Sequence, residues 1–489
     1  MRPVALALAA LALAGCAYPV RNYPIDPAGP KPPYRMTNLP PAELADTLVI
    51  VTASGGGTRA AALTMATLRA MADIALPTGK HLSDEVDVIS SVSGGSVTAA
   101  DFALYGVQGF PTLERDFIRK DGIGRLLWAE LNPLGLAQLS TNGRERIDPL
   151  IDYFDDALFH GKTLGDLVDG RRHPYLVLNA ADMVEGMPFA FTQDTFDLIC
   201  SDAARTKLAT AVAASAAFPV ALSPVTLKNY SPCPAHGANW RPVWAKVATE
   251  TDTSKDQGWY DNPALMSRAR LAMDYAAGNS AQHPKRYIHL LDGGIADNLG
   301  VTEPYRMLAT TEVKPSYLNA IAGGTIRKIV FVMINARSQP LSPLDGTQAT
   351  PGIVDMLLGT INSGIDRTTF GNAQMVRALL TDTFKDQARQ AAANGDADAA
   401  RNFKTVADNT FLIPVDFDAI ADPGCRLAYH SMSTSWTLGG GEIDALIKIG
   451  PALFGQSPDF APAMTALGGR PEHGFASVDD VCKGLPAKL

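Results

Sequence analysis

Residues 48–53 form a short, continuous apolar run rich in β-branched side chains, and three consecutive glycines separate it from an Ala-, Leu- and Met-rich stretch over residues 61–76. An apolar run of this length, so rich in β-branched residues, is typical of a buried strand, whereas the following stretch is typical of a helix. Strands that alternate with helices in this way build a largely parallel sheet. The feature therefore predicts an α/β fold.

The alternation continues along the chain, which has 489 residues and is 46% hydrophobic, enough to bury a large core. We expect further strands in five apolar segments: residues 175–180, 188–192, 287–291, 328–335 and 411–415. A polar, helical stretch covers about residues 361–406. The pattern predicts a mostly parallel central sheet covered by helices on both faces.

The glycine loop is Gly55, Gly56 and Gly57, between the first strand and its helix. Glycines at a strand-to-helix junction leave backbone N–H groups uncovered at a helix N-terminus, and such a site suits an anion, including the oxyanion of a tetrahedral acyl intermediate. No Gly-Lys-Ser/Thr follows, which argues against a nucleotide-binding P-loop. Tight strand–helix packing is the alternative use of these glycines.

Ser93 lies in a run of small residues, 90–96, between an apolar strand-like segment at 86–89 and a segment with helical character at 97–104. A serine on a tight strand-to-helix turn exposes its hydroxyl, which is the mechanical basis of a nucleophile elbow. Downstream, Asp292 ends the strand at 287–291 and is followed by two glycines. A carboxylate at the carboxyl end of a strand can project into the crevice where α/β sheets bind ligands.

These motifs resemble, in order, those of the patatin-like phospholipase family. The matches are the glycine loop with Arg59, the elbow at 93–95, and the Asp-Gly-Gly sequence at 292–294; a looser match is the Ala/Ser-rich segment at 214–219. The resemblance covers about residues 48–299. Ser91 and Ala60 stand where glycine is usual in the family, and both are small.

The resemblance implies a three-layer α/β/α fold and a lipid acyl hydrolase that uses a Ser-Asp dyad and needs no metal or cofactor. Ser93 would be the nucleophile and Asp292 the base, with the oxyanion hole in the loop Gly55–Gly57. Gly94 would support the oxyanion site, and Arg59 would orient the glycine loop or contact substrate. A solvated Arg59 remains an alternative, and so does Asp297 as a rival carboxylate.

A Ser-His-Asp triad would need an imidazole beside Ser93. His289, His430 and His473 are open candidates, but none has a recognisable triad context, and no His-Glu-x-x-His zinc motif is present.

Two other functions stay open: a general esterase or thioesterase with the same dyad, and a non-catalytic lipid-binding envelope lipoprotein. The chain carries 42 Lys+Arg against 50 Asp+Glu, which argues against nucleic acid as a partner.

The N-terminus predicts export. Arg2 precedes an apolar run at residues 4–15 that is too short to span a bilayer and fits a signal peptide. The run ends in Leu-Ala-Gly-Cys, which resembles the bacterial lipobox, and by this resemblance Cys16 would be lipidated and become the first residue of the mature protein. Cleavage near Ala14 with release is the alternative. With alanine after Cys16, we expect a lipid anchor in the outer membrane of the cell envelope, facing the periplasm or the surface.

The predicted organisation has four parts, and the sequence indicates no particular oligomeric state. They are a signal peptide at 1–15, a lipid-anchored, proline-rich linker at 16–42, a catalytic domain at 43–345 with insertions near 122–165 and 229–283, and a helical region at 346–489 packed on it. The linker would act as a semi-rigid spacer, and the insertions are candidate lids.

Four cysteines remain after processing, an even number that is compatible with disulfides in an exported chain. Sequence order favours Cys200–Cys233 and Cys425–Cys482, although other pairings and free buried thiols stay open, and the spacings match no zinc site.

Overall fold

A computed structural model describes residues 21–26, 32–124, 144–219, 221–237, 240–251, 263–310, 312, 316–339, 346–348 and 350–485. Its centre is an eight-stranded sheet. The strands are β1 (Thr47–Ala53), β3 (Val88–Val92), β4 (Tyr175–Asp182), β5 (Pro188–Ala190), β6 (Val225–Lys228), β7 (Tyr287–Asp292), β8 (Lys328–Asn335) and β9 (Thr410–Asp416). Two short strands, β2 (Ile74–Ala75) and β10 (Arg470–Pro471), form a separate antiparallel pair.

The strand order is β6-β7-β4-β3-β1-β8-β9, and β5 pairs with β4 outside this path. Strands β4, β3, β1, β8 and β9 are mutually parallel, whereas β5 and β7 run antiparallel to β4. Every residue of β1 and β4 is buried, because helices cover both faces of the sheet. The sheet is therefore mixed but mostly parallel, as the sequence predicted.

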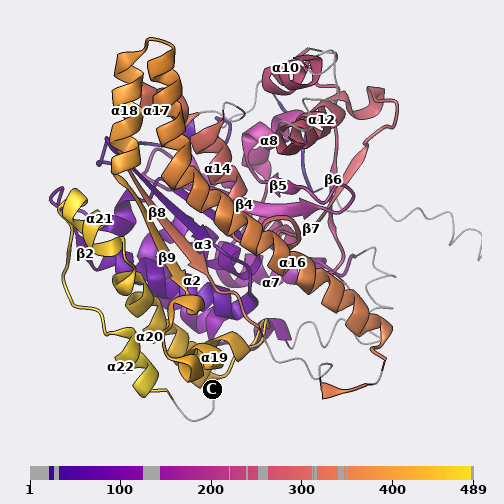
Figure 1. Cartoon of the computed structure of the whole chain (residues 1–489). Helices are drawn as coiled ribbons and strands as arrows, with labels where there is room; N and C mark the ends of the chain where they lie inside the picture. Colours follow the sequence, from indigo (N-terminus) through magenta and orange to yellow (C-terminus); the bar gives the residue numbers. More distant parts are fainter. Residues whose placement is uncertain are drawn as a thin grey trace, which may run out of the picture.

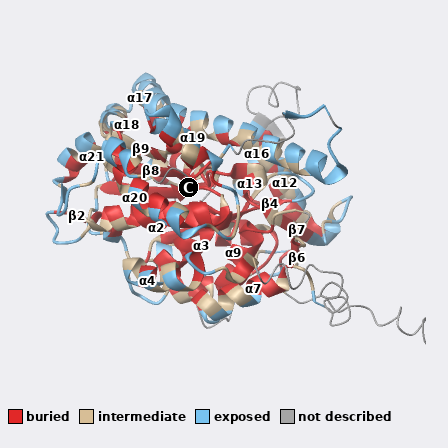
Figure 2. Cartoon of the chain, turned by 90° about the horizontal axis from the view of Figure 1, so that it is seen from below, coloured by how far each residue is buried: buried red, intermediate tan, exposed pale blue. Residues whose placement is uncertain are grey.

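Helices α2, α3, α9 and α20 pack together on one face of the sheet, and α14, α15 and α18 lie on the other (Figures 1 and 2). This arrangement is the predicted α/β/α sandwich. The helices are α2 (Gly57–Ala72), α3 (Ser93–Tyr105), α4 (Phe110–Leu113), α7 (Asp148–Phe154), α8 (Gln193–Leu198), α9 (Leu208–Ser215), α10 (Val243–Thr251), α12 (Pro263–Ala277), α13 (Gly294–Asp297), α14 (Thr302–Ala309), α15 (Tyr317–Ala322), α16 (Ile353–Ala378), α17 (Phe384–Ala393), α18 (Ala397–Asp408), α19 (Pro423–Ser431), α20 (Gly440–Gln456), α21 (Phe460–Leu467) and α22 (Val478–Lys483).

The region after residue 345 contributes to the central sheet as well as to the helical layers. β9 pairs in parallel with β8 over its whole length, and α20 packs on α2, the helix that follows the glycine loop. The predicted boundary between 345 and 346 therefore separates residues that share one sheet. The helical stretch predicted at 361–406 is divided among α16, α17 and α18, and β6 was not predicted.

The described parts of the proline-rich segment, 21–26 and 32–42, lie against the body, so the expectation of a free spacer is wrong for these residues. Tyr34 is fully buried, and its hydroxyl bonds both backbone groups of Leu176. Arg35 forms ion pairs with Asp194 and Asp197. The prolines keep this segment extended, but its aromatic and charged side chains bind to the sheet and to α8.

The structure joins Cys200 to Cys233 and Cys425 to Cys482, the pairing that sequence order favours. The second disulfide ties α19 to α22. The predicted signal peptide at 1–15, Cys16 and much of the insertion near 122–165 lie outside the described residues. None of the helices in the described ranges combines the length and apolar character that crossing a bilayer requires.

Candidate active site

The sheet register brings Ser93 and Asp292 together across β4. Val92, the last residue of β3, pairs with Asn179 of β4, and Asp292, the last residue of β7, pairs with the next residue, Ala180. The sequence predicted Asp292 at the carboxyl end of a strand, and it is there. The strand, however, runs opposite to its neighbour. Asp292 lies beside the end of β3 because β4 extends beyond β3 and β7 returns alongside it.

Ser93 is the first residue of α3 and has a left-handed backbone conformation, with φ of 50°. A side chain rarely adopts this region, and such strain is typical of a nucleophile elbow. The Ser93 N–H donates to the Ser215 hydroxyl at 2.9 Å. This hydrogen bond fixes the strained turn, so that the nucleophile's backbone is held by another helix.

The end of α9 positions both members of the pair. The Ser215 carbonyl accepts the N–H of Gly293 at 3.1 Å, and the Ala217 carbonyl accepts the N–H of Asp292 at 3.0 Å. Together with the Ser215 hydroxyl, these contacts set the spacing between the two active-site turns. The sequence marked this segment only as a looser family match and gave no role to Ser215.

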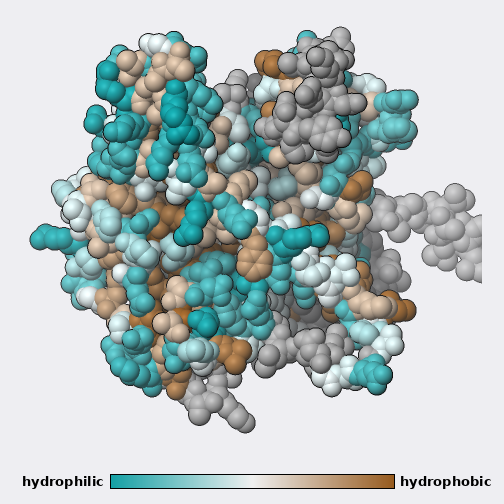
Figure 3. Space-filling view, in the orientation of Figure 1, coloured by the Kyte–Doolittle hydropathy of each residue, from teal (hydrophilic) through white to brown (hydrophobic). Residues whose placement is uncertain are grey.

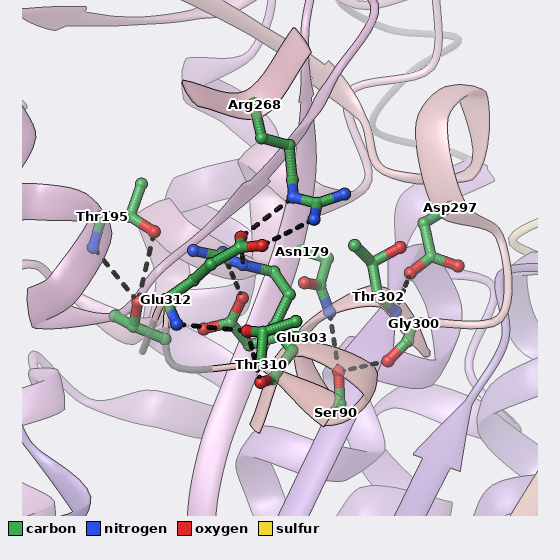
Figure 4. A network of polar contacts seen from close by, with 12 residues as sticks. Ser90, Asn179, Thr195, Arg268, Asp297, Gly300, Thr302, Glu303, Thr310 and Glu312 are labelled. Carbon is green, nitrogen blue, oxygen red and sulfur yellow. Dashed lines mark hydrogen bonds and ion pairs between the residues drawn. The ribbon is translucent and has the colours of Figure 1, made fainter. Parts of the chain in front are cut away.

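Asn179 was also missed. Its side chain donates to the Ser90 hydroxyl at 2.9 Å and to the Ser91 carbonyl at 3.0 Å, while the Ser90 hydroxyl donates to the Gly300 carbonyl (Figure 4). The Asn179 side chain and the Ser90 hydroxyl thereby connect β3, β4 and the segment after α13 next to the site. A polar residue inside an otherwise apolar strand was the available signal, because such a residue needs buried partners.

The Ser93 side chain lies beside the buried Asp292 carboxylate and stabilises its ionised form. Burial raises the pKa of Asp292 to about 6, and the hydrogen bonds from the Gly294 N–H and from Ser93 act in the opposite direction. A carboxylate with this pKa is a stronger base than an ordinary aspartate and is still mostly ionised at neutral pH.

Among the described residues, two of the N–H groups in the glycine loop are free to bind a ligand. The N–H of Gly55 donates to the Asn298 carbonyl, and that of Thr58 donates to the Ser435 carbonyl. Gly55 was predicted to be an oxyanion donor, and this role is wrong because its N–H is already bonded. Within the described part of the chain, the N–H groups of Gly56 and Gly57 have no acceptor, which leaves them for a ligand.

Two close backbone contacts explain why glycine is needed at the junction of loop and elbow. A Cβ on Gly57, whose φ is +61°, would lie 2.2 Å from the Ser435 carbonyl oxygen, and a Cβ on Gly94 would lie 2.0 Å from the Gly57 carbonyl oxygen. Gly94 thus lets the elbow touch the glycine loop. The N-termini of α2 and α3 consequently converge on the site, where their partial positive charge favours an anion.

Arg59 is 1% exposed, which excludes a solvated side chain. Its guanidinium donates to the carbonyls of Ala336, Met432 and Ser433, and to the Thr434 hydroxyl. Burial lowers its pKa to about 10. Arg59 therefore orients the glycine loop by fastening it to the segment at 432–435, which the sequence did not connect with the site.

The remaining candidates bond elsewhere. Asp297 accepts from the Thr302 N–H and the Asn372 amide. Two of the open histidines contact carboxylates, His430 on Asp418 and His473 on Asp73, and the third, His289, contacts the Thr226 hydroxyl. In the described ranges, the one group with metal-ligand geometry is Asp73, Glu472 and His473, which shares no residue with the site.

We expect Gly57→Ala to lower kcat by about 10²–10³-fold, the usual effect of losing an oxyanion donor, because the added methyl group would push the loop away from Ser435. Gly79→Ala is the matched control: Gly79 also has a positive φ, +81°, but no atom lies within 4 Å of its Cβ position. Kinetics with a chromogenic ester would compare the two variants. Equal losses in both would contradict a donor role for the loop.

Comparison with known proteins identifies a family. The family model described as patatin-like phospholipase matches residues 51–305, slightly more than half of the chain. No curated protein matches the sequence. Among solved structures, human GIVD cytosolic phospholipase A2 is 11% identical with a TM-score of 0.32, over 75% of this chain and 61% of that one. The chain thus spans less than two thirds of that protein's length, and a similarity of this size carries no argument about function.

Proposed function

The chain belongs to the patatin-like phospholipase family, and from this premise we propose that it hydrolyses carboxylic esters of lipids with Ser93 as nucleophile and Asp292 as general base. The observation that carries the proposal is the placement of Ser93 and Asp292 beside each other at the end of β4, together with two glycine-loop N–H groups that have no acceptor among the described residues. The proposed nucleophile, base and oxyanion donors thus lie at one site.

The reaction follows from these positions. Ser93 Oγ attacks the ester carbonyl carbon while Asp292 accepts its proton, and the N–H groups of Gly56 and Gly57 stabilise the oxyanion. The intermediate then expels the lipid alcohol, which takes the proton from Asp292, and leaves an acyl-enzyme on Ser93. Water attacks this ester after giving a proton to Asp292. The fatty acid leaves, and the proton returns to Ser93.

A lipid panel tests the proposal. Fatty-acid release would be measured from a diacyl phospholipid, a lysophospholipid, a triacylglycerol and a water-soluble short-chain ester, and a fluorophosphonate probe would be mapped to its modified residue. Release from the lipids with labelling of Ser93 supports a lipid acyl hydrolase. Turnover of the short ester alone identifies a general esterase, and lipid binding without release identifies a non-catalytic protein.

The pH dependence of kcat/KM should report the base. Because Asp292 acts as the carboxylate, its pKa of about 6 predicts activity that falls as the pH drops through about 6 and is level above about 7. The profile would be measured from pH 4.5 to 8.5 with the short ester, and circular dichroism at each pH would confirm folding. A profile that stays flat between pH 5 and 7 would argue against this base.

We also propose that Cys16 is lipidated and anchors the protein to a bacterial outer membrane. The lipobox-like sequence supports this, and so do the two disulfides, which suit an exported protein. Cys16 lies outside the described residues. Incorporation of an alkynyl fatty acid that is abolished by Cys16→Ala would support the anchor, whereas incorporation that persists in this variant would refute it.

A further inference from the structure

The first half of α16 has large apolar side chains facing solvent. Ile353 is 81% exposed, Val354 56%, Met356 51% and Leu357 46%. No residue from 353 to 368 is buried, and Figure 2 draws much of the helix as exposed. The helix runs across the front of the molecule, and apolar surface is visible over its protruding end (Figures 1 and 3). Contiguous exposed apolar side chains of this kind are typical of an interaction surface.

The apolar residues follow a helical repeat. Ile353 and Val354 are followed at intervals of three or four by Leu357 and Leu358, and then by Ile361 and Ile365, whereas Asp355, Asn362, Ser363 and Asp366 lie between them. This spacing places the apolar side chains in one stripe along the helix. A surface helix usually turns such a stripe into the protein core, but here the stripe is exposed or half-buried.

The second half of the same helix is bonded to the catalytic loops. The Asn372 side chain donates to Asp297 at 2.8 Å, and the Asn298 amide lies 3.4 Å from the Thr369 hydroxyl. The Asn298 carbonyl in turn accepts the N–H of Gly55 in the glycine loop. The exposed stripe therefore lies on the same helix whose second half contacts the segment that follows Asp292. At 1.5 Å per residue, about 24 Å separate residues 353 and 369 along the helix.

The low charge of residues 353–365 favours a zwitterionic over an anionic lipid surface. Residues 353–365 contain one charged side chain, Asp355, whose carboxylate accepts the N–H of Gly352 at the helix start, and they contain no lysine or arginine. The whole chain is acidic, with a formal charge of −8. Anionic lipid would thus gain no electrostatic attraction, whereas a zwitterionic bilayer can accept the apolar stripe without paired charges.

We propose that the first half of α16 is a membrane-docking helix whose apolar stripe inserts into the surface of a zwitterionic bilayer and holds the active site near its lipid substrate. This inference rests on the proposed lipid hydrolase function, because a membrane substrate is what requires the protein to dock on a bilayer. The helix lies in the bilayer surface and does not cross it, as interfacial amphipathic helices do.

The test measures flotation of the full chain with phosphatidylcholine vesicles. All proteins carry Cys16→Ala, so that a lipid anchor cannot contribute. The docking variant combines Ile353→Ser, Val354→Ser and Leu357→Ser, and the matched control combines Val243→Ser and Val247→Ser on α10, which are 76% and 57% exposed. We expect the docking variant to bind vesicles at least about tenfold more weakly, equivalent to about 1.4 kcal/mol. The control should bind as the parent does, and salt should have little effect.

Unchanged vesicle binding by the docking variant would overturn the proposal, and so would an equal loss in the α10 control. Conversion of a parent dimer to monomer by the α16 substitutions, with vesicle binding retained, would assign the stripe to a second copy of the chain and would also overturn it. Hydrolysis of the water-soluble ester separates the two proposals. It should be unchanged in the docking variant. If the parent hydrolyses neither the soluble ester nor any lipid of the panel while vesicle binding still depends on α16, the enzymatic function fails and the docking surface stands.

Discussion

Ser93→Ala is expected to lower kcat/KM for every hydrolysed ester by at least about 10⁴-fold, because the substitution removes the attacking oxygen and no acyl-enzyme can form. The fold should survive. The backbone N–H that donates to Ser215 is retained, and the substitution removes only the side-chain oxygen beside Asp292. Fatty-acid release and fluorophosphonate labelling would both be measured.

Ser96→Ala is the matched control for this prediction. Ser96 is a buried serine of the same helix, and its hydroxyl forms hydrogen bonds with those of Ser91 at 3.1 Å and Ser215 at 3.0 Å. We expect it to retain activity within about tenfold of the wild type. If Ser93→Ala kept wild-type turnover, or if labelling persisted in it, the nucleophile would have to be sought at another residue.

Asp292→Asn should lower kcat by about 10³–10⁴-fold while keeping the shape of the site, because the amide oxygen can still accept the Gly294 N–H but cannot take the proton of Ser93. Asp297→Asn is the control. That residue is equally buried but bonds Thr302 and Asn372, so its variant should stay active. The reverse result, with loss of activity only in Asp297→Asn, would transfer the role of base to Asp297.

Asp292→Asn should also stabilise the protein above pH 6. In the folded protein the pKa of Asp292 is raised from 3.8 to about 6, so ionisation of this carboxyl weakens the fold as the pH rises through that range, by about 3 kcal/mol at the plateau. Asparagine does not ionise and avoids this loss. Thermal unfolding should show Asp292→Asn with a higher Tm than wild type at pH 8 and a small difference near pH 4. Equal Tm values at pH 8 would contradict the buried carboxylate.

Several parts of the site could be predicted because they depend on short-range rules. A β-branched apolar run followed by glycines and a helix is recognisable within about 20 residues, and so are the Ser93 turn and the Asp-Gly-Gly turn after β7. Their order along the chain was enough to indicate the family and to select Ser93 and Asp292. Short-range rules fail for the proline-rich segment. Its composition indicated a spacer, but the buried hydrogen bonds between Tyr34 and Leu176 of β4 depend on a contact distant in sequence.

What the sequence determined by itself was the fold class and the chemical groups of the site, because strand and helix periodicity and turn chemistry are encoded in neighbouring residues. Only the tertiary structure decided which of these groups can contact a substrate and which are bonded within the protein. It turned β7 antiparallel, occupied the N–H of Gly55 with Asn298, and fixed Arg59 to residues 432–434. These outcomes depend on strand register and on contacts between segments up to 375 positions apart, and no local pattern specifies such pairings.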